Sequence, residues 1–111
     1  MEVHKNLGPG LLEGVYEDCL VEELVLRGVS VKRQVRYPIR YKGHEISHPL
    51  IIDLLVGDSV IVELKAVSEL LDIHSAQLLS YLKLSGIKLG LLINFNTALL
   101  RDGIKRIVNN L

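Results

Sequence analysis

Residues 50–67 read LIIDLLVGDSVIVELKAV. Two runs rich in Ile, Leu and Val flank the Gly-Asp pair at 57–58, a pattern that is typical of two strands joined by a hairpin turn. Asp53 interrupts the first run, and Glu63 and Lys65 interrupt the second. Burying an ionised group costs several kcal/mol unless the group is paired or binds a metal. These three charged residues are therefore the first candidates for a functional site.

The length of the turn decides whether the two acids meet. A two-residue turn at 57–58 would pair position 53 with position 62, and Asp53 would then point away from Glu63. A three-residue turn over 57–59, or a bulge, would put both carboxylates on one face of the strand pair. We therefore expect an odd-length turn or a bulge if the two acids form one site. Glu63 and Lys65 lie two positions apart and share a face in either case.

Two acids and a lysine on adjacent strands suggest a metal site rich in oxygen ligands. Mg²⁺ prefers such ligands and keeps several of its waters. A divalent ion there would help to activate water for attack, while the ion and the lysine steady the charge that develops on a phosphate. The alternative is a strand pair whose solvated face carries a Glu–Lys contact. The residues alone do not decide between these two interpretations.

The remaining sequence predicts an α/β fold. Hydrophobic spacing and breaker residues predict helices at 1–6, 11–27 and 73–84, strands at 29–41, 50–56, 60–67 and 87–94, and a short strand or helix at 103–108. Pro38 marks a break or a sheet edge in the first strand region, and residues 42–44 form a turn. This order of elements predicts a mixed central sheet flanked by helices.

Composition narrows the class of protein. The chain has 111 residues, of which 49% are hydrophobic and 23% charged, with a formal net charge of zero. We expect a single domain over residues 1–111 that does not coat nucleic acid by bulk charge. The single cysteine, Cys19, fits a reducing compartment, and the sequence shows neither a signal peptide nor a membrane-spanning run. We therefore expect a cytoplasmic protein with no membrane partner.

Polar residues on two predicted helices add to the candidates. His74, Gln77 and Tyr81 lie about one turn apart on one helix face. They could contact a phosphate or orient a water, or they could form the polar rim of an ordinary amphipathic helix. Glu13 lies near the start of another helix, where the helix dipole favours an acid in any protein.

Taken together, these motifs resemble a known family. Residues 10–16 read GLLEGVY and match the pattern for which the GxxExxY protein family, a branch of the PD-(D/E)XK nuclease superfamily, is named. The resemblance extends over nearly the whole chain, through segments 3–5, 7–10, 60–67, 76–82, 90–95 and 103–106. The seven-position pattern would be weak alone, but it is specific in register with Asp53, Glu63-Leu64-Lys65 and Gln77…Tyr81.

The resemblance implies a restriction-endonuclease-like αβββαβ core and a set of site residues. By analogy, Asp53 and Glu63 would bind Mg²⁺ or Mn²⁺ together with the backbone carbonyl of Leu64. Lys65 would be the catalytic lysine. Glu13 would correspond to the acid of the first core helix that assists the metal in RecB-like nucleases.

The resemblance also implies roles beyond the metal ligands. Gln77 and Tyr81 would match the downstream Gln-x-x-x-Tyr motif, contacting the substrate phosphate or the groups around the metal, and His74 is a further candidate for that role. The leading hypothesis is a Mg²⁺- or Mn²⁺-dependent nuclease that hydrolyses phosphodiester bonds in DNA, with RNA less favoured. The alternative hypothesis is an inactive module of the same fold that binds nucleic acid or a protein partner.

Two departures from the family pattern bear on these expectations. Many members carry an arginine two positions before the motif aspartate, where this chain has Ile51, and segment 44–49 is unusual for the family. Family chains also usually start earlier, so the first helix is expected to lack its beginning here. A shortened first helix would expose core residues and favour a homodimer.

Overall fold

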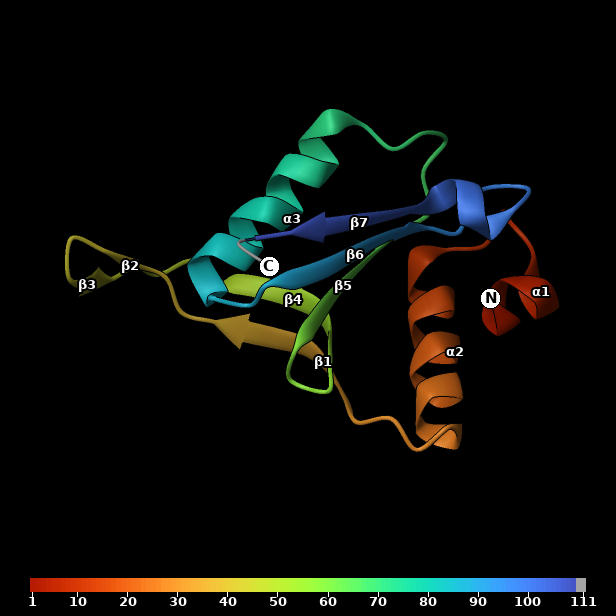
Figure 1. The fold of residues 1–111 in the computed structure, drawn as a ribbon, viewed down its shortest axis with the longest axis horizontal. Coiled ribbons are helices and arrows are strands. Elements are labelled where there is room, and N and C mark those ends of the chain that lie inside the picture. Colours follow the sequence, from red (N-terminus) through yellow and green to blue (C-terminus); the bar gives the residue numbers. More distant parts are fainter. Residues whose placement is uncertain (110–111) are drawn as a thin grey trace.

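The computed structural model describes residues 1–109 as a mixed five-stranded sheet with helices packed against it (Figure 1). In chain order the elements are α1 (Glu2–Leu7), α2 (Glu13–Leu26), β1 (Val31–Tyr37), β2 (Arg40–Tyr41), β3 (His44–Glu45), β4 (Leu50–Val56), β5 (Val60–Lys65), α3 (Asp72–Ser85), β6 (Leu89–Asn94), the 3-10 helix η1 (Leu100–Gly103) and β7 (Ile104–Val108). The predicted αβββαβ order is confirmed by α2, β1, β4, β5, α3 and β6, with the β2–β3 hairpin inserted after β1.

The main sheet has the strand order β1-β4-β5-β6-β7. The β5–β6 pair is parallel and the other neighbouring pairs are antiparallel. A parallel pair needs a long crossover, and α3 supplies it between β5 and β6. The central strand β5 pairs with β6 from Val60 to Lys65, but with β4 only from Val60 to Val62.

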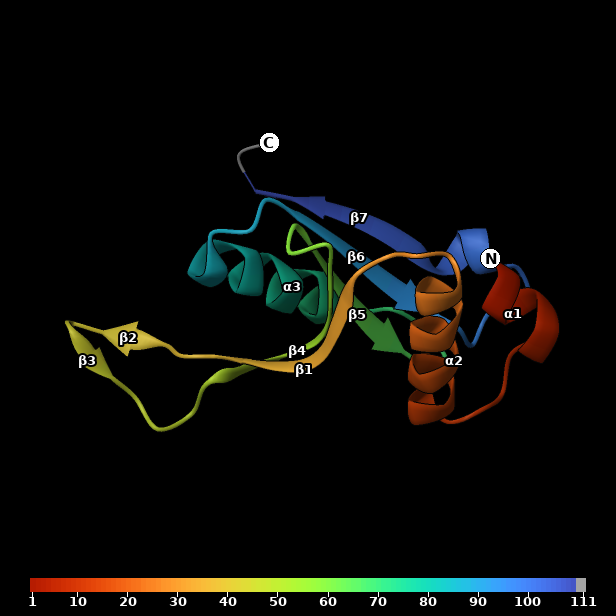
Figure 2. The same cartoon turned by 90° about the horizontal axis from the view of Figure 1, so that it is seen from below.

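Two clusters of buried side chains hold the helices to the sheet. The first joins α1 and α2 to the sheet through Val3, Tyr16, Leu54, Val62, Leu64, Phe95 and Leu100. The second joins α3 to the sheet through Ile52, Ile61, Leu78, Leu82 and Leu92. Figures 1 and 2 show α2 and α3 well apart from each other, against different parts of the sheet. Strand β4 contributes to both clusters, through Leu54 to the first and through Ile52 to the second.

Several element boundaries differ from the prediction by one to four residues. The helix predicted at 11–27 begins at Glu13, and the strand predicted at 87–94 begins at Leu89. Gly86 ends α3 in the left-handed conformation (φ 75°), so the next residues serve as the connection rather than as strand. The segment at 103–108 is a strand, and the short strand β3 was not predicted.

The β2–β3 hairpin projects from the body of the molecule in both views (Figures 1 and 2). Pro38 separates it from β1, as its inability to donate a ladder hydrogen bond leads one to expect. No helix within residues 1–109 combines the length and apolar character that crossing a membrane requires.

Candidate active site

The turn between β4 and β5 has three residues, 57–59, as the two-acid site requires. Val56 pairs with Val60, and the ladder continues to Leu54 opposite Val62. This register puts Asp53 opposite Glu63, one step beyond the last paired residues. The expectation of an odd-length turn is therefore confirmed.

Where the main-chain hydrogen bonds between β4 and β5 end, the side chains of the two acids accept backbone N–H groups of the opposite strand. Glu63 Oε1 accepts the backbone N–H of Asp53 at 3.1 Å, and Asp53 Oδ2 accepts the backbone N–H of Leu64 at 2.9 Å. Side-chain carboxylates thus occupy positions that main-chain carbonyls would fill in a regular sheet. The reciprocal bonds fix both carboxylates beside the Leu64 peptide.

Strand β4 also changes orientation at Asp53. Residues two apart in a regular strand share a face, yet Ile52 packs with α3 while Leu54 packs with α1 and α2. On the neighbouring strand, Gln34 has φ 51° and is missing from the otherwise continuous β1–β4 register, opposite Asp53. A non-glycine residue in this conformation inside a strand is uncommon and costs of order 1–3 kcal/mol. The sheet is therefore irregular on both sides of Asp53.

Burial and mutual repulsion perturb the carboxylate of Glu63. Its side chain is 8% exposed. Desolvation and the nearby charge of Asp53 raise the pKa of Glu63 to about 8, although Lys65 acts in the opposite direction. The buried carboxylate of Glu63, beside the half-buried carboxylate of Asp53, is therefore under electrostatic strain.

Two helices bring further titratable groups to these acids. Desolvation, followed by the charge of Asp53, raises the pKa of Glu13 at the start of α2, and Lys65 lowers it. Desolvation and the charge of Glu63 raise the pKa of Tyr81 on α3. Gln77 Nε2 donates to the Tyr81 hydroxyl at 3.1 Å. The charges of the two acids thus act on titratable groups of both α2 and α3.

His74 has a structural contact that the sequence did not reveal. Its Nδ1 accepts the backbone N–H of Leu71 at 3.0 Å, which is the return bond of a capping box at the start of α3. This bond stabilises the first turn of the helix that carries Gln77 and Tyr81. No hydrogen bond links His74 to the two acids in the described part of the chain.

The tyrosine of the GLLEGVY segment is also structural. Tyr16 is fully buried and stacks on Phe95 at 4.5 Å between ring centroids. Its hydroxyl donates to the Gly8 carbonyl at 2.6 Å and accepts the Leu11 backbone N–H at 3.1 Å. These bonds fix the loop before α2, so they position Glu13 one helical turn before Tyr16.

Asn94 supports the end of β5, although it belongs to none of the candidate site motifs of the sequence. Its side chain is 1% exposed and bridges to the loop after β5, accepting the Val67 N–H at 3.1 Å and donating to the Val67 carbonyl at 2.9 Å. Asn94 lies opposite Lys65 in the β5–β6 register. A polar residue ending a buried apolar strand was the available signal.

Few side chains are placed to bind a metal ion at this site. Across residues 1–109 no group of three or more His, Cys, Asp and Glu side chains is arranged to hold a metal. Two carboxylates and a main-chain oxygen fit the hard oxygen ligands of Mg²⁺, which retains waters for its remaining positions. The acids present therefore suit a partly hydrated ion and not a closed cage.

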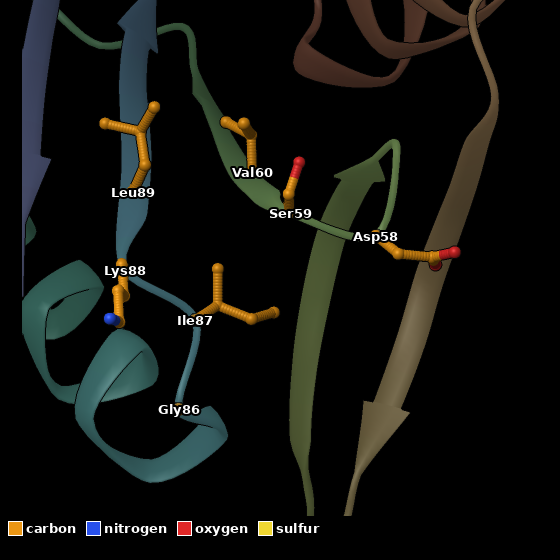
Figure 3. A pocket seen from close by; sticks show the side chains of 7 residues that line it. All are labelled: Asp58, Ser59, Val60, Gly86, Ile87, Lys88 and Leu89. Atoms are coloured by element: carbon orange, nitrogen blue, oxygen red, sulfur yellow. The ribbon is translucent and has the colours of Figure 1, made fainter. Parts of the chain in front are cut away.

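A mostly apolar hollow lies elsewhere on the molecule. A cavity of about 470 Å³ is lined by Asp58, Ser59, Val60, Gly86, Ile87, Lys88 and Leu89 (Figure 3). It opens at the beginnings of β5 and β6, whereas Lys65 ends β5. None of the predicted site residues lines it.

Comparison with known proteins agrees with this architecture. Residues 1–107 match the family model of the PD-(D/E)XK nuclease superfamily. The crystal structure of SSO0001 is similar, with a TM-score of 0.65 at 19% sequence identity over 88% of this chain and 50% of that chain. This chain thus spans half the length of that protein, and the likeness concerns the fold alone. Among curated proteins, none matches.

Proposed function

Because the chain belongs to the PD-(D/E)XK nuclease superfamily, we propose that it hydrolyses phosphodiester bonds in DNA with the help of Mg²⁺ or Mn²⁺. Superfamily members are usually nucleases and typically use divalent metals. The observation that carries the proposal is the reciprocal pair of bonds between Asp53 and the strand bearing Glu63, Leu64 and Lys65.

The metal would be held by the acids that follow the last paired residues of β4 and β5. Asp53, Glu63 and the backbone carbonyl of Leu64 are the proposed ligands, and Glu13 would contribute from α2. A divalent cation would relieve the repulsion and desolvation that raise the pKa of Glu63. When bound, such an ion polarises the phosphate and lowers the pKa of water.

The remaining residues of the site would orient and stabilise the substrate. Lys65 shares a face with Glu63 and forms no ion pair within residues 1–109, so its ammonium is available to a phosphate oxygen. Tyr81, oriented by Gln77, would contact the phosphate or a water beside it. His74 would act mainly by capping α3, although the sequence suggested a phosphate contact.

We also assign the chain to the GxxExxY branch of the superfamily. The GLLEGVY segment has a physical reason for its glutamate and its tyrosine, because Tyr16 anchors the loop that brings Glu13 to the acids. Residues 1–111 would form a single domain. The predicted homodimer and cytoplasmic location remain predictions.

A cleavage assay tests the activity. Wild-type protein should cut DNA in Mg²⁺ or Mn²⁺, and Asp53→Asn and Lys65→Ala should each lose at least about 100-fold in rate. Asp58→Asn and Lys83→Ala are matched controls, because both residues are exposed. DNA cleavage by Asp53→Asn at the wild-type rate would refute the assignment.

The inactive module remains the second candidate. It is favoured by the hydrogen bonds that already satisfy part of both carboxylates without a metal, and by the absence of a larger acidic cluster in residues 1–109. Calorimetric titration with Mn²⁺ separates the two functions. Binding that Asp53→Asn abolishes supports the nuclease, whereas no binding at millimolar metal supports the module.

A further inference from the structure

A basic arm stands away from the candidate active site. We define it as residues 36–48, which leave the end of β1, form the β2–β3 hairpin and return to β4. Every residue from 40 to 48 is exposed, and the projection is visible in both views (Figures 1 and 2). An isolated two-stranded hairpin is only marginally stable in water. Because this segment adds almost nothing to the core, we expect it to serve for binding a partner molecule.

The arm carries cations that the rest of the molecule does not neutralise. It contains Arg36, Arg40 and Lys42 against the single acid Glu45, which gives a net charge of +2 with histidines neutral, while the whole chain nets zero. No ion pair within residues 1–109 involves the three arm cations, so within the arm only Glu45 offsets their charge. The positive charge is thus concentrated and open to a polyanion.

The tip of the arm has a defined conformation. Lys42 and Gly43 both have positive φ (50° and 81°), as in the two-residue type I′ turn that matches strand twist. Tyr41 is 63% exposed, and the Lys42 ammonium lies 5.5 Å from the centre of its ring. A further backbone bond, from Ile46 N–H to the Ile39 carbonyl at 3.0 Å, closes the base of the hairpin. The cations are therefore presented on an ordered ribbon.

We propose that this arm binds duplex DNA beside the phosphodiester held at Asp53 and Glu63. DNA is chosen as the polyanion because of the proposed nuclease function, on which this inference therefore rests. Duplex DNA fits the shape, because its major groove admits a two-stranded β-ribbon. Lys42 at the tip lies eleven positions before Asp53, a span of at most about 40 Å, so the arm reaches at most about 12 base pairs from the cleaved bond.

A binding assay without metal tests the arm independently of cleavage. The probe is a fluorescein-labelled duplex of about 24 base pairs, titrated in EDTA at several salt concentrations. The variant is Arg36→Gln/Arg40→Gln/Lys42→Gln, and the control Lys83→Gln/Lys88→Gln/Arg106→Gln removes three exposed charges elsewhere. The arm variant should bind at least about tenfold more weakly, and the slope of log K against log salt should fall by about 2–3. The control should bind like the wild type.

Three results would overturn the proposal. The first is equal weakening of the arm variant and the control, and the second is binding by the arm variant that matches wild type. The third is tighter binding of wild type to single-stranded than to duplex DNA. Hydrolysis of bis(p-nitrophenyl) phosphate in Mn²⁺ is measured in parallel, because so small a phosphodiester cannot reach the arm. Its absence in wild type would count against the proposed activity, and its retention in the arm variant alongside weakened DNA binding supports the arm.

Discussion

Replacing Glu63 by Gln should change how the stability of the metal-free protein depends on pH. Burial, and then the charge of Asp53, raise the pKa of Glu63 from 4.5 to about 8. Between these two values the folded state keeps a proton that the unfolded state releases. Stability must therefore fall as pH rises from about 4.5 to about 8, and the fall must end above that range. Glutamine has the same shape, can keep the contacts with Asp53 and does not titrate.

The size of this change in stability follows from the shift in the pKa of Glu63. At about 1.4 kcal/mol for each pH unit, the full effect is at most about 5 kcal/mol, and local relaxation around a group that is 8% exposed will reduce it. For a chain of 111 residues, 1 kcal/mol corresponds to about 4 °C in Tm. We expect the Tm of wild type to fall by about 8–15 °C between pH 5 and pH 8 relative to Glu63→Gln, and the variant to be the more stable protein at pH 8.

The assay is thermal unfolding in EDTA, followed by circular dichroism from about pH 5 to about pH 9. Glu45→Gln is the matched control, because Glu45 is exposed on β3 and the substitution makes the same change of charge. The control should follow the wild-type curve. If Glu63→Gln also ran parallel to wild type over the whole range, the electrostatic strain assigned to the two acids would be wrong.

Three further substitutions test the frame around the site, each by urea unfolding. Tyr16→Phe should lower the free energy of unfolding by about 1–3 kcal/mol, because the buried hydroxyl donates to the Gly8 carbonyl at 2.6 Å; a loss below about 0.5 kcal/mol would contradict this anchoring role. Gly103→Ala should destabilise by more than about 2 kcal/mol, since an added Cβ would lie 2.3 Å from the Asn94 backbone oxygen, and a neutral effect would mean that the two segments are farther apart. Gln34→Gly should raise the free energy of unfolding by about 0.5–1 kcal/mol, because glycine adopts the positive φ of 51° without strain; this net value allows for the loss of the exposed hydrogen bond from Gln34 to Glu17. Gln34→Ala should not raise the free energy of unfolding, because alanine keeps the backbone strain.

The sequence by itself determined the order of the main elements and showed that the length of one turn decides whether the two acids meet. Two short apolar runs around a Gly-Asp pair favour a strand hairpin, and the period of two in a strand made the turn length decisive for Asp53 and Glu63. The three-residue turn fulfils that condition, and strand β4 spans Leu50–Val56 as predicted. Local patterns sufficed here because hydrogen bonding along adjacent strands is fixed by register.

Only the tertiary structure decided what surrounds that pair. The break in the β4–β5 ladder, the left-handed Gln34 opposite Asp53 and the capping bond of His74 all depend on where separate segments meet. The projection of the β2–β3 hairpin likewise follows from its lack of a packing partner, which no local pattern encodes. Residue type sets which groups carry charge, but burial and distance set how strongly those charges interact, and both are properties of the packed chain.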